Sequence, residues 1–152
     1  MELLKTQESH FWLEKTITEF TPEEWESLCD GCGKCCLHKL RDAKSGRIYF
    51  TNVVCRYSDL KTCQCTDYEN RHENVPTCVF LTPKMAVEAD WLPKTCAYRR
   101  IARGEGLLWW HPLVSGDIKS VQMSGNSIVG RVVQENEVDL DDLEDMVVEW
   151  FD

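Results

Sequence analysis

The sequence lacks the features that direct a chain into a membrane or out of the cell. It starts Met-Glu-Leu-Leu-Lys-Thr-Gln-Glu-Ser-His, without the basic stretch and apolar run of a signal peptide. No apolar run approaches the ~18 residues that a membrane span needs. We therefore expect no membrane association and a cytoplasmic protein, in a compartment that keeps thiols reduced.

Basic residues are absent from the end of the chain. The terminal segment 135–152 contains nine acidic side chains and no Lys or Arg, whereas residues 1–134 contain 17 acidic and 17 basic ones. The formal net charge of −9 therefore lies entirely in this terminal segment. Because no basic face is evident, nucleic-acid binding is not expected. The segment predicts an acidic C-terminal helix that could contact a basic protein partner.

Linkers rich in Pro, Gly or Ser and internal repeats are missing as well. A chain of 152 residues is long enough to bury about two-thirds of its unfolded surface as one domain. We therefore expect residues 1–152 to form a single cysteine-rich domain.

Cysteine, by contrast, is abundant. Four of the nine cysteines fall within eight residues, and all nine are candidate metal ligands: Cys29, Cys32, Cys35, Cys36, Cys55, Cys63, Cys65, Cys78 and Cys96. In a reducing compartment such a density favours metal ligation over disulfides. Eight thiolates would suffice for two four-coordinate centres, with one thiol spare.

The crowded motif favours a soft metal. Thiolate sulfur selects zinc, copper(I) or iron–sulfur clusters, and glycine beside the cysteines lets backbone N–H groups approach the sulfurs. Cys29, Cys32 and Cys35 have the spacing of the first three ligands of a bacterial ferredoxin, but Cys36 follows at once instead of three residues later. We expect an iron–sulfur cluster, with Zn²⁺ as the alternative. Because adjacent side chains tend to point apart, Cys35 and Cys36 are expected to serve different sites, or one of them none.

The remaining pattern predicts a small, irregular α+β fold with short helices and a β-hairpin. Residues 55–78 are polar and irregular, so a metal would have to organise them. Of the histidines, His38 is a less favoured ligand and His111 is expected to be packed. Helices are expected over 9–20, from a cap at Thr21-Pro22, from Thr82-Pro83, over 93–103 with Cys96 on the first turn, and from Asp139 to the end of the chain. Strands are expected over 46–54 and as a hairpin of 119–123 and 127–133.

Several of these segments carry a resemblance to a known family. The chain resembles the bacterial YcgN-like family, a branch of the Cys-x-x-Cys-x-x-Cys-Cys proteins described as zinc- or iron-chelating. The matching segments are Trp25-Glu26-Ser27-Leu28-Cys29-Asp30-Gly31-Cys32-Gly33, Ile48-Tyr49-Phe50-Thr51-Asn52-Val53, Thr62-Cys63-Gln64-Cys65, Trp91-Leu92-Pro93, Thr95-Cys96-Ala97-Tyr98-Arg99 and His111-Pro112-Leu113. The resemblance implies metal or cluster binding and no particular reaction.

The broader group also has a later cysteine, then Cys-x-x-Tyr-x-x-Arg, then a further cysteine. The resemblance maps these onto Cys55, onto Cys65 with Tyr68 and Arg71, and onto Cys78. It thereby implies that Tyr68 and Arg71 lie beside the ligands. The spacing to Cys78 is three residues longer than usual. Cys63 and Cys96 lie outside the broader pattern, so Cys96→Ser is expected to be the mildest change.

Three functions are compatible with these residues. The favoured one is a metal- or iron–sulfur-cluster-binding protein. The alternative is a zinc-stabilised protein-interaction module that uses the acidic helix or the Trp109-Trp110 corner. A thiol–disulfide oxidoreductase is less favoured, because redox-active Cys-x-x-Cys pairs usually follow a strand and open a helix, whereas Cys29 is expected to close one.

Overall fold

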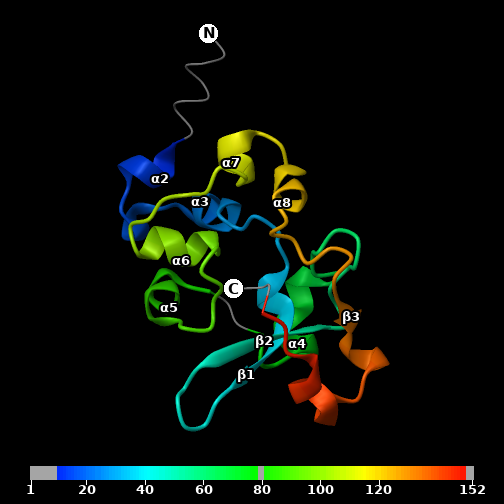
Figure 1. Ribbon diagram of the computed structural model, residues 1–152. Coiled ribbons are helices and arrows are strands. Elements are labelled where there is room, and N and C mark those ends of the chain that lie inside the picture. The colour runs from blue at the N-terminus through cyan, green and yellow to red at the C-terminus, as the bar shows by residue number, and fades with distance from the viewer. Residues whose placement is uncertain (1–9, 79–80, 150–152) are drawn as a thin grey trace.

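The computed structural model describes residues 10–78 and 81–149. Short helices make up one part of the molecule and a small sheet the other (Figure 1), as the α+β expectation requires. The helices are α2 (Phe11–Glu14), α3 (Pro22–Ser27), α4 (Arg71–Asn74), α5 (Pro83–Glu88), α6 (Ala97–Ala102), α7 (Pro112–Ser115) and α8 (Ser120–Met123). Short 3-10 helices cover Ile17–Glu19, Lys34–Cys36, Tyr68–Asn70, Glu135–Glu137 and Leu140–Met146.

The sheet has three strands in the order β1-β2-β3. Strands β1 (Leu37–Arg41) and β2 (Ile48–Val54) form an antiparallel hairpin, and β3 (Val133–Gln134) runs parallel to the end of β2. The hairpin turn is closed by Asp42, whose Oδ1 accepts the N–H groups of Lys44 and Ser45. The expected strand over 46–54 is thus confirmed as β2.

Helices α3 and α5 begin where the predicted capping residues place them. Thr21 Oγ1 accepts the N–H of Glu24 while Glu24 Oε1 accepts that of Thr21, which is the reciprocal capping box. Thr82 caps α5 in a similar way, through the N–H of Met85. Cys96 is the residue before the first turn of α6 rather than part of that turn.

Two separate cores stabilise the fold. The helical core contains Trp12, Leu28 and Ala97, and the sheet core contains Leu37, Phe50, Val54, Cys63 and Ile128. Leu28 and Leu37 are almost fully buried, one in each core. The cysteine loop, residues 29–36, is the segment between them, so both of its ends are fixed by apolar packing.

The expected hairpin over 119–133 is wrong. Ser120–Met123 is helix α8, and the chain then turns until β3 begins at Val133. Local hydrogen bonds explain the difference, because the N–H of Met123 donates to Lys119 O and that of Ser124 donates to Ser120 O, as in a helical turn. The hairpin of this fold lies instead at β1-β2.

The two ends of the described chain also differ from expectation. The helix expected over 9–20 is split into α2 and the 3-10 helix 17–19, because Thr16 and Glu19 form a new capping box; Ser9 lies outside the described residues. The terminal helix is a 3-10 helix, Leu140–Met146, after which Val147 pairs with Thr51; Trp150 and Phe151 lie outside the described residues. In the described ranges, no helix has the length and apolar character to span a membrane.

Candidate metal centre

The cysteine loop is shaped by two glycines in left-handed backbone conformations. Gly31 has φ +74° and Gly33 has φ +82°, values that favour glycine. Asp30 Oδ1 accepts the N–H of Cys32 at 3.0 Å, which closes the first turn. A 3-10 turn over 34–36 then presents Lys34, Cys35 and Cys36 in succession.

Neighbouring segments hold this loop in place through its carbonyl groups. Ile128 N donates to Cys32 O at 3.0 Å, and Cys55 N donates to Cys36 O at 3.0 Å. At the start of the loop, Nε2 of the buried His111 lies 2.7 Å from Leu28 O, while its Nδ1 accepts the N–H of Leu113. Both ring nitrogens are therefore engaged, and His111 is packed as the sequence predicts.

Four thiols share one electrostatic environment at the loop: those of Cys29, Cys32, Cys35 and Cys96. Burial raises the pKa of Cys29 to about 12, with further rises from Cys35 and Cys96. Burial likewise raises the pKa of Cys96 to about 11, with a contribution from Cys35. The pKa of Cys32 rises for the same reasons, burial first and then Asp30 and Cys35. Cys96 therefore joins the crowded motif from far along the chain.

The Cys35 thiol differs from its neighbours. The Cys36 thiol donates a hydrogen bond to it, and together with the nearby Lys39 ammonium this lowers the pKa of Cys35 to about 6. The same bond raises the pKa of Cys36 well above its usual value. The Cys35 and Cys36 thiols therefore shift each other's pKa, and the expectation that they serve different sites stays a prediction. Cys29 and Cys35 nevertheless keep part of their surface exposed to solvent, so the burial that raises the pKa of Cys29 is incomplete and a metal has access to both residues.

A second group of thiols lies on the side of the sheet. The pKa of Cys36 is raised by the bond with Cys35, by burial and, to a smaller extent, by Cys55. Burial raises the pKa of Cys55, with smaller contributions from Glu135 and Cys65. The backbone supports this grouping. The N–H of Cys55 donates to the carbonyl oxygen of Cys36, and the antiparallel bridge between Ser58 and Cys65 brings Cys65 back toward Cys55. Cys78 follows α4, where its N–H bonds to Val75 O.

Cys63 has a different environment from the other eight. It is 5% exposed, belongs to the apolar sheet core, and its Sγ lies 3.5 Å from Ser127 Oγ. Its backbone has φ +61°, an uncommon value for a residue other than glycine. Cys63 therefore packs beneath the loop, against Gly33 and Ile128, as a small apolar side chain does.

The donor chemistry of these groups suits zinc or iron, both of which thiolates bind well. Within residues 10–78 and 81–149, no three His, Cys, Asp or Glu side chains converge as a preformed metal site. The thiols therefore share a neighbourhood but would have to rotate toward a metal.

Aromatic and acidic side chains border the first group. Tyr68 donates to Glu26 at 2.9 Å, and the Arg71 guanidinium lies 3.8 Å from the Tyr68 ring. Burial is the main cause that raises the pKa of Tyr68, and Glu26 and Cys29 make smaller contributions. Burial, and then Cys29, raise the pKa of Tyr98, a residue of the matching segment to which the sequence assigned no role at the site. His38 contacts Glu135 at 3.3 Å.

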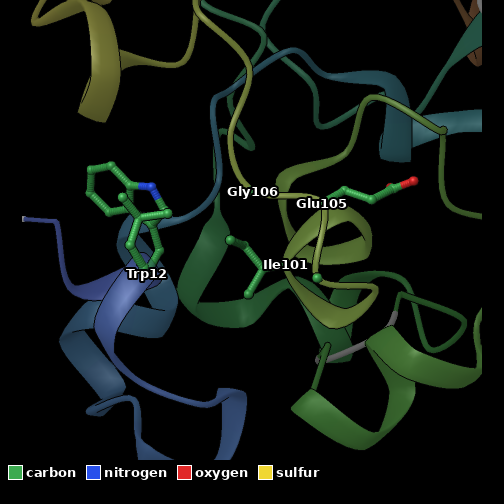
Figure 2. A pocket seen from close by; sticks show the side chains of 6 residues that line it. Trp12, Ile101, Glu105 and Gly106 are labelled. Carbon is green, nitrogen blue, oxygen red and sulfur yellow. The ribbon is translucent and has the colours of Figure 1, made fainter.

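A cavity of about 370 Å³ lies elsewhere, between α2 and the end of α6. Its lining includes Trp12, Ile101 and Glu105 but no cysteine. Figure 2 shows the Glu105 side chain extending away from Trp12. The cavity is therefore separate from the thiols.

Comparisons with known proteins show which family the chain belongs to. Residues 28–97 match the CxxCxxCC family model, described as "Putative zinc- or iron-chelating domain". A UPF0260 protein of Cellvibrio japonicus is 55% identical over 92% of this chain and 95% of its own length. UPF0260 proteins of Rhizobium leguminosarum bv. trifolii and Parvibaculum lavamentivorans are 54% and 50% identical, over 92% and 94% of this chain and 88% and 94% of their own. No solved structure matches significantly.

Proposed function

Because the chain belongs to the UPF0260 family and carries a region of the zinc- or iron-chelating type, we propose that it binds an iron–sulfur cluster through cysteine thiolates. The observation that carries the proposal is the shared environment of the thiols of Cys29, Cys32, Cys35 and Cys96. Four thiolates are the usual ligand number for a [2Fe–2S] or [4Fe–4S] cluster. When bound, the cluster would supply one-electron chemistry or a store of iron, in a reducing, cytoplasmic setting.

The second group of thiols supports a second centre. Cys36, Cys55 and Cys65 lie on the sheet side of the loop, and Cys78 is the remaining thiol that could complete four ligands. Cys63 is then the spare thiol, because it packs in the apolar sheet core. This partition revises the expectation for Cys96, whose replacement we now expect to be as severe as that of Cys29.

The test is purification without oxygen, followed by iron, zinc and acid-labile sulfide analysis and a visible spectrum. We expect brown protein with iron and sulfide. If the protein is colourless and contains stoichiometric zinc, the bound metal is structural zinc and the proposal of a cluster is wrong. Protein with nine free thiols and no metal would overturn both the cluster and the zinc proposals.

Serine variants then test the partition. Serine preserves shape but is a poor ligand for soft metals. Cys29→Ser and Cys96→Ser should each lose most of one centre, whereas Cys63→Ser should keep full metal content. Equal metal content in Cys96→Ser and wild-type protein would remove Cys96 from the ligand set.

The second candidate, a zinc-stabilised interaction module, is favoured by exposed apolar side chains. Trp109, Ile118 and Met123 are each more than 60% exposed, on or beside α7 and α8. The acidic segment from residue 135 offers a surface for a basic protein partner. Zinc in place of iron in the analysis above, with a partner that binds only zinc-loaded protein, would support this candidate.

A further inference from the structure

Two lysine side chains, Lys34 buried and Lys39 half-buried, lie at the cysteine loop without a carboxylate partner among the described residues. Lys34 is 4% exposed, and its Nζ donates to Thr95 Oγ1 at 3.0 Å. Lys39 Nζ donates to the carbonyl oxygens of Cys35 and Leu37, at 3.0 and 2.9 Å. Among the described residues, neither ammonium has a carboxylate oxygen within salt-bridge distance.

A buried cation without a counter-ion is costly, so such groups are normally paired. The environment of Lys39 shows which charges compensate it. The sulfurs of Cys35, Cys36 and Cys32 act on it electrostatically. Its Nζ lies over the rings of Phe50 and Trp91, at 5.5 and 5.7 Å from the ring centroids. These aromatic faces favour the cation but carry no net charge. Thiolates are thus the anions available to Lys39.

Lys34 adds a second positive charge from inside the motif. It lies between Gly33 and Cys35 in the loop, and its single hydrogen bond ends at Thr95, the residue before Cys96. This bond ties the loop to the segment that brings Cys96 to the other three thiols. One of its three N–H donors is engaged in that bond, and the other two have no acceptor in the described structure.

We propose that Lys34 and Lys39 are the built-in counter-cations of a net-anionic thiolate centre, and that they set its affinity for metal. The inference rests on the proposed function, because it needs a metal held by these thiolates. A divalent metal with four thiolates carries a formal charge of −2, and a [4Fe–4S]²⁺ cluster with four thiolates carries the same charge. Two ammonium groups match that charge. Lys34 also acts as a positioning residue for Cys96.

The test measures Zn²⁺ affinity, by competition with a chromophoric chelator, on full-length protein that is reduced and free of oxygen. Zinc serves as the probe because it binds the same thiolates whichever metal is native. Lys39→Met keeps an unbranched side chain of similar length but removes the charge that faces Phe50 and Trp91, and Lys39→Arg restores the charge. Groups that support metal ligands typically change affinity about 10–100-fold when they are replaced. We expect that loss in Lys39→Met and in Lys34→Met, with most of the affinity recovered in Lys39→Arg.

Lys44→Met is the matched control, because Lys44 is exposed in the hairpin turn and its replacement changes the net charge equally. It should bind zinc like the wild type. If Lys39→Met folds, as judged by circular dichroism, and binds zinc as tightly as Lys44→Met, the inference is wrong while the proposed function stands. If the wild type itself binds neither zinc nor iron, both are overturned. Should Lys39→Met fail to fold, the comparison of Lys34→Met with Lys44→Met decides.

Discussion

The sharpest prediction concerns the two glycines of the cysteine loop, which have similar backbone conformations and different surroundings. A Cβ added at Gly31 would meet no atom within 4 Å. At Gly33 it would come within 2.6 Å of Ile128 Cδ1, 2.7 Å of Ile128 Cγ1 and 3.1 Å of Cys63 Cβ. Alanine at either position would destabilise the fold because it has to adopt the left-handed conformation. Only at Gly33 would the added Cβ also overpack the sheet core.

The magnitudes follow from these two terms. A left-handed conformation costs a non-glycine residue about 1–2 kcal/mol, and overpacking a filled core costs about 1–3 kcal/mol more. Gly31→Ala should therefore lower the free energy of unfolding by about 1–2 kcal/mol. Gly33→Ala should lower it by about 1–3 kcal/mol beyond that.

The assay is urea unfolding of the metal-free, reduced variants, read from midpoint and slope. A double-mutant cycle with Ile128→Ala isolates the clash, because that change removes both of the nearest atoms. In the Ile128→Ala background, Gly33→Ala should cost about 1–3 kcal/mol less than in the wild type. Equal losses for Gly31→Ala and Gly33→Ala, with no coupling to Ile128, would refute the close packing of the loop on the sheet core.

Three further predictions use other parts of the structure. In metal-free protein, the rate of alkylation of Cys35 should rise with pH through a midpoint near pH 6, because its thiolate forms above its lowered pKa. Cys36→Ala should move that midpoint upward, and a midpoint above pH 8 in the wild type would contradict the hydrogen bond from Cys36. Amides of the loop 29–36 should exchange more slowly with metal bound, which mass spectrometry can measure against metal-free protein, and equal rates would mean that metal orders nothing there. Arg41→Ala should cost under about 1 kcal/mol by thermal unfolding, since the bidentate pair with Asp90 is solvent-exposed; a larger loss would require a role beyond this pair.

The sequence was sufficient where local chemistry decides the structure. The capping box at Thr21, the proline starts of α3 and α5 and the apolar run of β2 all depend on neighbours within a few residues. The crowded motif also identified the region of the site without further information. Strand β1 was missed, because Leu37–Arg41 carries three basic side chains and only two apolar ones.

Long-range contacts were beyond a single sequence. No local pattern predicts that Cys96 lies near Cys29. Their proximity depends on two long-range contacts, the hydrogen bond from Lys34 to Thr95 and the packing of Leu28 with Ala97. The terminal segment had helical spacing, but its acidic side chains repel one another along a helix. The contacts of Val147 and Val148 with β2 then extend the chain instead.

The order in which the chain is synthesised adds a constraint on how the cysteine loop is completed. Cys29, Cys32 and Cys35 leave the ribosome first, but the loop's fixed geometry depends on Thr95, Cys96 and Ile128, which are made much later. A nascent chain would thus expose three soft ligands without the residues that complete and cover them. Such a chain offers only a loose, incomplete site to any metal it meets. Metal held as proposed by Cys29, Cys32, Cys35 and Cys96 would therefore reach its full affinity only after residue 128 has been synthesised.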